Sequence, residues 1–412
     1  MTAFSPCTFS SDWENFVVDH LDRCVPAWRL QGFAGELNAE LGLPITVDKE
    51  SLEFPLGINT TFAQFWDRIK RTTDRASELL HDFQLRLFPA AAHPVIRTFN
   101  SSHIHVGTLT DESTGIYLEN HLLDFIPAFA ALAANSPASQ GMVGEFKSYR
   151  VHTNAHYLIQ PSSWRDPYVS QKIWGTDASP KLEVAPTQEI RITDCASSRR
   201  FLAELATFVT AFVQHEAKAV QPAPPDPQAY RDYLVNRWCA ARDGMQATFR
   251  RHGRTITAAE MLAEMLDTCT QELQALGVNT HDLVLVNAMI DKRICQADLV
   301  LRLAERYPDP YALASVYGKL LRDWEWFDDY LLQATPLDPR PALSEQDIIM
   351  EHVKAIGEGT YYYRTRDVMN FPAAAADAVV EEAINAGLIR REYYSERGVV
   401  LSRIPSGTAG EG

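Results

Sequence analysis

The sequence predicts an α+β protein with an antiparallel sheet in its first half and packed helices in its second. Alternation of polar and apolar residues, the signature of a half-buried strand, recurs up to about residue 197. From residue 198 the pattern changes to helical periodicity with almost no strand signal. A last segment, 344–405, places three helices before a two-stranded hairpin, which is the order of a small winged-helix-like domain.

A chain of 412 residues is too long for one compact core, so we expect more than one domain. Residues 1–332 are predicted to form the main domain, sheet-rich to about 197 and helical over 198–332. The predicted parts that follow are a proline-rich linker at 333–343, the winged-helix-like domain at 344–405 and a disordered tail at 406–412.

The composition excludes several classes of function. A formal net charge of -15 argues against a nucleic-acid surface, which needs clustered Lys and Arg. The six cysteines are scattered without a Cys-x-x-Cys pair, which is typical of reduced thiols in a cytoplasmic protein. The N-terminus lacks the regions of a signal peptide, and the longest apolar stretch, 122–134, is too short to span a membrane. We therefore predict a cytoplasmic protein that binds neither nucleic acid nor membrane, and leave a homo-oligomer open.

The elements can be assigned in chain order from periodicity, caps and breakers. Helices are expected at 12–21, 62–87, 115–134, 198–218, 230–252 and 258–276. Strands are expected at 33–43, 51–57, 103–107, 150–159 and 187–194.

The first predicted hairpin joins strands 33–43 and 51–57 and carries carboxylates. Glu36, Asn38 and Glu40 recur at period two, so on a strand their side chains share one face. A carboxylate-lined face of this kind is typical of a site for a divalent cation.

The most informative stretch is His103-Ile-His105-Val-Gly107. Two imidazoles two residues apart face the same side of a strand. Such a pair suits a metal ion or a polyphosphate. The alternative is that both are half-exposed strand residues that bind nothing.

A further strand, 187–194, alternates polar and apolar residues. Glu189 and Arg191 share its polar face, where by themselves they suit an ordinary ion pair on an exposed sheet. Arg150, at the start of the predicted strand 150–159, is by itself typical of a surface arginine.

Five segments occur in an order that resembles a known family. They are Phe99-Asn-Ser-Ser-His-Ile-His-Val-Gly107, Leu132-Ala-Ala-Asn-Ser-Pro137, Gly144 with Ser148-Tyr149-Arg150, Glu189-Ile-Arg-Ile-Thr-Asp194 and Asn236-Arg-Trp-Cys-Ala-Ala-Arg-Asp-Gly244. The series resembles the carboxylate–amine ligases related to glutamate–cysteine ligase, in the glutamine synthetase superfamily, and covers roughly residues 33–320.

This resemblance implies a fold and a reaction. The fold is a curved antiparallel sheet of the glutamine-synthetase-like type, whose concave face binds ATP and Mg²⁺. The reaction is the ATP-dependent joining of an amino-acid-like carboxylate to an amine, through an acyl phosphate, with small-molecule substrates. Carboxylate-held cations and a fixed positive group suit phosphoryl transfer.

The resemblance also implies roles for individual residues. The implied metal ligands are Glu36, Glu40, Glu53, His103 and Glu189. The implied ATP contacts are His105, Arg191, Asn236 and Arg242. The residues implied to act in catalysis are Arg150, Glu189 and Arg191.

The chain departs from the family in two places. The family's Gly-x-Glu-x-Glu strand fits 35–40 only if Asn38 stands for a glutamate or the register slips, which leaves open the number of metals and the activated acid. The C-terminal domain is an addition. Residues 341–412 hold seven Lys and Arg against eleven Asp and Glu, the wrong charge for gripping DNA.

The C-terminal domain therefore suggests either a packing module or one that binds a peptide or carrier protein. The ligase would then act in a specialised or peptide-modifying pathway. The alternative function is a non-catalytic ligase-fold protein that binds a protein or peptide partner through the winged helix.

Overall fold

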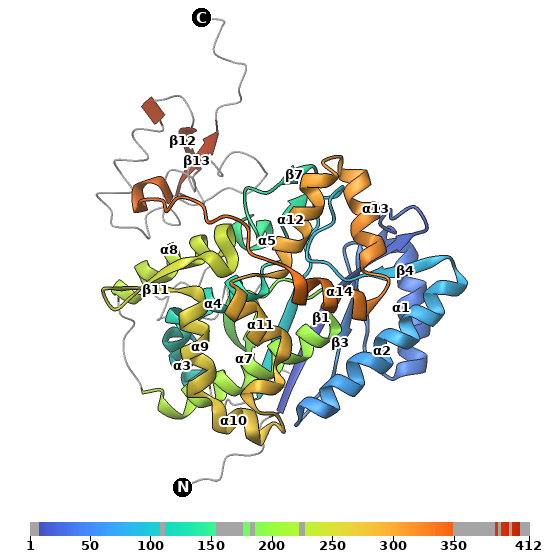
Figure 1. Ribbon diagram of the computed structural model, residues 1–412, viewed down its shortest axis with the longest axis horizontal. Coiled ribbons are helices and arrows are strands. Elements are labelled where there is room, and N and C mark those ends of the chain that lie inside the picture. The colour runs from blue at the N-terminus through green and yellow to red at the C-terminus, as the bar shows by residue number, and fades with distance from the viewer. Residues whose placement is uncertain are drawn as a thin grey trace, which may run out of the picture. The chain divides into compact units, whose positions relative to one another are not determined.

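A computed structural model describes residues 8–107, 112–153, 176–181, 186–221, 227–348, 384–385, 389–394 and 398–403. The chain divides into two compact units, 1–339 and 340–412 (Figure 1). The boundary falls inside the segment 333–343 that the sequence predicts to be a linker.

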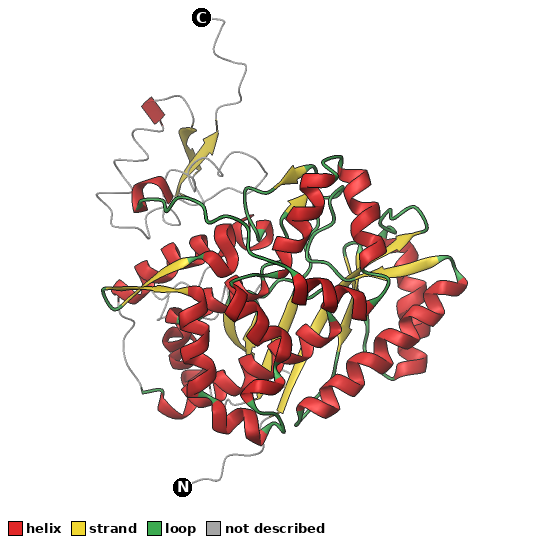
Figure 2. Cartoon of the chain, viewed as in Figure 1, coloured by secondary structure: helices red, strands yellow, loops and turns green. Residues whose placement is uncertain are grey.

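The first unit is built on a seven-stranded sheet in which each recorded strand pair is antiparallel. The strand order is β2-β3-β1-β5-β9-β8, and β4 also pairs with β1. Figure 2 shows strands in yellow among the red helices of this unit. The strands are β1 (Thr8–Asp19), β2 (Thr46–Asp48), β3 (Ser51–Pro55), β4 (Leu85–Phe88), β5 (Ser102–Gly107), β8 (Ala178–Lys181) and β9 (Thr187–Ile190).

Alternation along these strands sorts side chains onto two faces. One face is apolar and buried, and α7 (Arg199–Ala219) packs against β1 and β5. The buried side chains of this apolar face are Phe9, Trp13, Leu52, Phe54, Ile104, Val106 and Ile190. The other face carries the polar or charged side chains of Asp12, Glu14, Glu53, His103, His105 and Glu189.

Helices make up most of the rest of the first unit. The long α2 begins where the Thr61 hydroxyl accepts a hydrogen bond from the Gln64 amide, and it buries one apolar stripe. The other helices are α1 (Ala27–Leu41), α2 (Phe62–Asp82), α3 (Glu112–His121), α4 (Ile126–Ala133), α5 (Tyr149–Thr153), α8 (Pro227–Asp243), α9 (Ala258–Thr268), α10 (Thr270–Ala275), α11 (Val284–Lys292), α12 (Gln296–Arg306), α13 (Pro310–Leu320) and α14 (Trp324–Gln333). Short 3₁₀ helices and hairpins complete it: η1 (Leu122–Asp124), η4 (Gly244–Gln246), η5 (Thr280–Asp282), β6 (Ala138–Ser139) with β7 (Met142–Val143), and β10 (Thr248–Arg251) with β11 (Arg254–Thr257).

Two predictions near the N-terminus are wrong, and they are linked. The sequence predicts a helix at 12–21, but residues 12–19 belong to β1, whereas most of the expected strand 33–43 belongs to α1. In α1 the buried residues Leu30, Phe33, Ala34 and Leu37 follow helical spacing, which outweighs the period-two spacing of its polar residues. The first hairpin of the sheet is therefore β2–β3, not 33–43 with 51–57.

Other boundaries also differ from the prediction. The helix expected at 62–87 ends at Asp82, and the one expected at 115–134 is divided into α3, η1 and α4. The helix expected at 230–252 ends at Asp243, and the β10–β11 hairpin, which the helical reading missed, follows. The strand expected at 150–159 begins as the helix α5, and its remainder lies outside the described residues.

A buried carboxylate joins the helices to the sheet just beyond β9. Asp194 accepts hydrogen bonds from the Asn135 amide (2.8 Å), the Ser136 hydroxyl (2.8 Å) and the Ser148 hydroxyl (3.0 Å). The Arg150 guanidinium lies 3.6 Å from it. Burial raises the pKa of Asp194 although Arg150 and these donors oppose the rise. This one side chain therefore fixes the end of α4 and the start of α5 against the sheet.

The second unit is described in part. β12 (Ile389–Tyr394) and β13 (Gly398–Arg403) form an antiparallel hairpin, where the sequence predicts one. The Ser344 hydroxyl accepts a hydrogen bond from the Asp347 amide at the start of a helix. Most of the segment in which the sequence predicts three helices before the hairpin lies outside the described residues, so the winged helix stays a prediction.

Two further observations bear on the predicted environment. Among the described helices, none combines the length and the apolar character that crossing a membrane requires. The five described cysteines, Cys24, Cys195, Cys239, Cys269 and Cys295, are free thiols.

Truncating a side chain on the apolar face of the sheet should lower the free energy of unfolding. Phe54 is fully buried in β3, and Phe54→Ala is expected to lower the free energy of unfolding by about 3–5 kcal/mol because it leaves a cavity. Trp28, which is 75% exposed, provides the control, and Trp28→Ala should change it by less than about 0.5 kcal/mol. Urea unfolding of both variants measures this, and equal effects would contradict the assignment of the two faces.

Candidate metal centre

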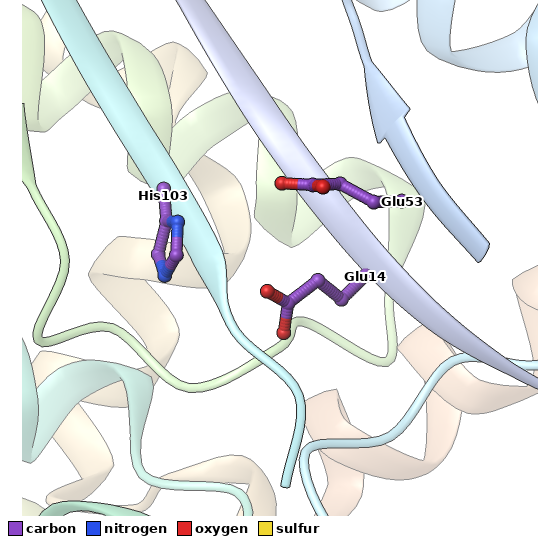
Figure 3. A group of neighbouring side chains, drawn as sticks. All are labelled: Glu14, Glu53 and His103. Carbon is purple, nitrogen blue, oxygen red and sulfur yellow. The ribbon is translucent and has the colours of Figure 1, made fainter. Parts of the chain in front are cut away.

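Strand register brings two carboxylates and an imidazole together on the polar face of the sheet. Glu14 of β1 lies opposite Glu53 of β3, and Asp12 of β1 lies opposite His103 of β5. One ligand atom from each of Glu14, Glu53 and His103 lies within 4.8 Å of the others, and the three side chains converge in Figure 3. We call these three residues the metal group.

Two hydroxyl residues fix the metal group. Ser101 donates its backbone amide (2.6 Å) and its hydroxyl (2.9 Å) to Glu14. The same hydroxyl lies 2.6 Å from Nε2 of His103, so Ser101 ties the two ligands together. On the other side, the Thr46 hydroxyl donates to Glu53 at 2.8 Å.

The electrostatics of the metal group favour a bound cation. Burial raises the pKa of Glu14 to about 7; the charge of Arg150 opposes this and that of Glu53 adds to it. Burial also raises the pKa of Glu53. Burial and the neighbouring Arg191 hold the pKa of His103 well below its usual range, so its imidazole is neutral.

These residues fit a divalent metal ion. A neutral imidazole and two carboxylates are metal ligands, and carboxylates suit hard cations such as Mg²⁺ and Mn²⁺. Glu14 and His103 are each only 7% exposed, and buried charge without a partner is costly. A cation would remove that cost by favouring the ionised form of both carboxylates.

Next to the metal group the sheet face becomes cationic around Glu189. Its carboxylate lies 2.7 Å from Arg191, 3.2 Å from Lys181, 3.5 Å from His103 and 3.8 Å from His105. Burial opposes ionisation of Glu189, but Arg191 and the other neighbouring cations lower its pKa overall. Glu189 is therefore a carboxylate held among cations, beside the metal group.

His105 is held on both ring nitrogens. Nε2 lies 3.0 Å from a carboxylate oxygen of Asp12, and Nδ1 lies 3.3 Å from the Thr187 hydroxyl. Burial lowers the pKa of His105, but the hydrogen bond to Asp12 and the charge of Glu189 outweigh it and raise the pKa overall. An imidazolium is thereby favoured here, which suits a phosphate contact.

The structure gathers most of the residues that the sequence singled out. Glu53 and His103 belong to the metal group, and His105, Glu189 and Arg191 lie beside it. Whether Glu189 itself binds a metal and Arg191 a phosphate stays a prediction.

Glu36 and Glu40 are not in the metal group, because their predicted place on a strand is wrong. Both are exposed on α1, and Glu40 pairs with Arg75 of α2 at 2.5 Å. The error follows from reading a helix as a strand.

Three other predicted site residues make structural contacts. Arg150 donates to the carbonyl oxygens of Arg191 and Ile192. Asn236 exchanges two hydrogen bonds with the backbone of Arg250, at 2.7 Å each, and so holds the β10–β11 hairpin against α8. The predicted contact of Asn236 with ATP stays a prediction.

Arg242, near the end of α8, lies over the ring of Trp238 and 3.4 Å from Asp243. Its predicted contact with ATP stays a prediction.

The sequence analysis missed four residues of the site: Asp12, Glu14, Ser101 and Lys181. A signal for the first two exists, because Ser10-Ser-Asp12-Trp-Glu14 has the spacing of the Gly-x-Glu-x-Glu strand. If the pattern is placed in β1 instead of at 35–40, Asp12 stands at the position of its first glutamate.

Comparison with known proteins identifies the family. The model of glutamate–cysteine ligase family 2 matches residues 94–154 and 175–309, which include both histidines, Glu189 and Arg191. Over these residues the chain belongs to glutamate–cysteine ligase family 2. A relative from Paraburkholderia phytofirmans, named Putative glutamate–cysteine ligase 2, is 29% identical over 202 residues, or 44% of this chain. The match spans 53% of that relative, so the chain matches only about half of its length.

Solved structures show the same fold. The glutamate–cysteine ligase from Francisella tularensis, in complex with AMP, matches 93% of this chain and 98% of its own at a TM-score of 0.55 and 9% identity. A bifunctional glutathione synthetase from Pasteurella multocida matches 76% of this chain and 52% of its own at a TM-score of 0.51 and 12% identity. The predicted glutamine-synthetase-like ligase fold is thereby confirmed.

Removing one ligand of the metal group should weaken cation binding. Glu14→Gln is expected to lower the affinity for Mn²⁺ by about 10–100-fold, because an amide is a poorer ligand than a carboxylate. Titration followed by the electron paramagnetic resonance of free Mn²⁺ measures it. The control is Glu40→Gln, which alters an exposed carboxylate on α1 and should leave the affinity unchanged. Equal affinities in the two variants would show that Glu14 is not a ligand.

The buried Glu14 also predicts how stability depends on pH. Its pKa is raised from 4.5 to about 7, so the native state favours the protonated form. The stability from this group is complete below pH 4.5 and is lost as pH rises through 7, by about 3 kcal/mol. In EDTA, the unfolding free energy of the native protein should therefore fall relative to Glu14→Gln between pH 4.5 and 8. A constant difference over that range would contradict the burial of this carboxyl.

Proposed function

We propose that this protein is an ATP- and Mg²⁺-dependent carboxylate–amine ligase that forms an amide bond through an acyl phosphate. The observation that carries the proposal is the metal group beside Arg191 and Glu189 on one sheet face, in a chain of the glutamate–cysteine ligase family. Family membership and fold support an ATP-dependent amide ligase, and the AMP complex of the Francisella tularensis enzyme suggests use of ATP. We further propose that the metal ion is Mg²⁺ and that the intermediate is an acyl phosphate.

The proposed roles of the site residues follow from their charges. Glu14, Glu53 and His103 would hold Mg²⁺, which neutralises phosphate charge and supports in-line transfer when bound. Arg191 and His105, whose raised pKa favours the protonated ring, would face phosphate oxygens. Because Glu189 keeps Arg191 at 2.7 Å, this guanidinium is oriented before any ligand arrives.

The substrates are an amino-acid-like acid and an amine, with γ-glutamyl-cysteine formation as the reference reaction. Asp12 supports a departure from that reference. It stands at the first position of the family's carboxylate pair, and it hydrogen bonds His105. A carboxylate engaged in this way would reduce the ligands left for a second metal.

The second candidate function is a non-catalytic ligase-fold protein that binds a peptide or protein through the C-terminal unit. The specialised or peptide-modifying role of a ligase rests on the same unit. The metal group favours catalysis over this alternative, because a binding module has no need to bury two carboxylates beside a neutral imidazole.

Release of ADP tests the proposal. The protein with Mg-ATP is screened against acids and amines varied independently, and a matching pair should raise ADP release well above the ATP-only rate. His103→Ala and Glu189→Gln are each expected to lower turnover by at least ~100-fold. Arg200→Lys, on the helix α7, should leave it near the native rate.

Two outcomes would count against catalysis at this site. Near-native turnover in both His103→Ala and Glu189→Gln would refute the assignment of the site. No ADP release across a broad panel, with no binding of ATP, would favour the non-catalytic alternative.

A further inference from the structure

Two residues hold the backbone that carries Arg191. β9 ends at Ile190, and the next two peptide groups leave the ladder. The amides of Arg191 and Ile192 both donate to the carbonyl oxygen of Asp177, at 2.8 and 3.2 Å. The guanidinium of Arg150 donates to the carbonyl oxygens of Arg191 (2.7 Å) and Ile192 (3.0 Å). All four backbone polar groups at 191–192 are thus satisfied outside the sheet.

Asp177 is in turn anchored to α8. Arg237 donates from Nε to one of its carboxylate oxygens at 2.5 Å and from Nη2 to the other at 3.1 Å. The Tyr233 hydroxyl donates to the same carboxylate at 2.5 Å. Arg237 also donates from Nη1 to the Val151 carbonyl at 2.7 Å, one residue from Arg150. A single guanidinium therefore joins α5, α8 and the segment before β8.

This ion pair is buried, since the Arg237 and Asp177 side chains are 4% and 3% exposed. A buried ion pair is a poor source of stability, because desolvation offsets much of the attraction. A two-pronged arginine–carboxylate contact does, however, fix relative geometry. What it fixes here is the carbonyl oxygen that receives the Arg191 amide.

The Arg191 side chain is sensitive to that geometry. Its Nη1 lies 2.7 Å from Glu189, and 3.4 Å from Nδ1 of His103 in the metal group. A shift of the backbone at 191 would move the guanidinium away from both, and misplacement of about 1 Å is enough to weaken a site of this kind.

We propose that Asp177 and Arg237 are positioning residues that act through Arg191. Arg237 anchors Asp177 to α8, and the Asp177 carbonyl oxygen accepts the amides of Arg191 and Ile192. Arg150 donates to the carbonyl oxygens of the same two residues. Of the two tests below, the one that measures affinity for ATP rests on the proposed function. The one that measures the order of the Arg191 side chain needs no ligand and does not rest on it.

Nuclear magnetic resonance of arginine Nε–Hε groups tests the positioning directly. The Arg191 signal is assigned as the one that Arg191→Lys removes. Arg237→Lys keeps the charge but loses the two-pronged contact, and it should shift or broaden this signal. The matched control is Arg200→Lys, which alters another arginine paired with a buried carboxylate, Glu204. An Arg191 signal unchanged in Arg237→Lys would overturn the proposal.

A milder variant covers the case in which Arg237→Lys does not fold. Tyr233→Phe removes one hydrogen bond to Asp177 and keeps the aromatic ring, so a smaller change of the Arg191 signal in the same direction is expected. If it leaves the signal as it is in the native protein while Arg237→Lys is unfolded, the pair is structural and the proposal fails.

Affinity for Mg-ATP, measured by calorimetry without acid or amine, provides a second test. Arg237→Lys should weaken binding by about 10-fold in the native background, but by less than about 2-fold when Arg191→Lys is already present. An equal loss in both backgrounds would show that Arg237 does not act through Arg191. If the native protein binds no ATP, the proposed function fails, and the Arg191 signal still decides the positioning proposal.

Discussion

The burial of ionisable side chains on one face of an antiparallel sheet is the constraint on which the rest of the first unit depends. Glu14, His103 and Glu189 are all nearly inaccessible to water. Such groups persist in a fold only if each has a partner of suitable charge or a hydrogen-bond donor. Ser101 supplies donors to Glu14, and Arg191 neutralises Glu189. Behind the site, Arg150 contacts the backbone that carries one of these partners, Arg191.

The charges on this face are separated rather than mixed. Carboxylates dominate on β1 and β3, whereas Lys181 and Arg191 flank Glu189 of β9. A metal–triphosphate complex also has a positive and a negative part. Its two parts match the two halves of the face, which is why the proposed ligand satisfies both at once.

The sequence predicts those elements whose local pattern agrees with their burial. β3, β5 and α2 have clear period-two or helical spacing, and each lies within a residue or a few of its expected position. β1 was missed because Trp13 to Val18 is a run of buried residues, without the alternation of a half-buried strand. Glu14 was lost with it. The contact of Asp177 with Arg237 spans 60 residues of sequence, and no local pattern predicts such a pair.

The Asp194 contacts also determine which parts of the molecule open together. The amide proton of Asn135 is bound to a carboxylate 59 residues further along the chain, so it can exchange with solvent only when the end of α4 separates from the segment after β9. The same separation exposes the hydroxyls of Ser136 and Ser148. The end of α4, the start of α5 and the end of β9 therefore form one cooperative unit, whose opening would disassemble the arginine side of the site in a single step.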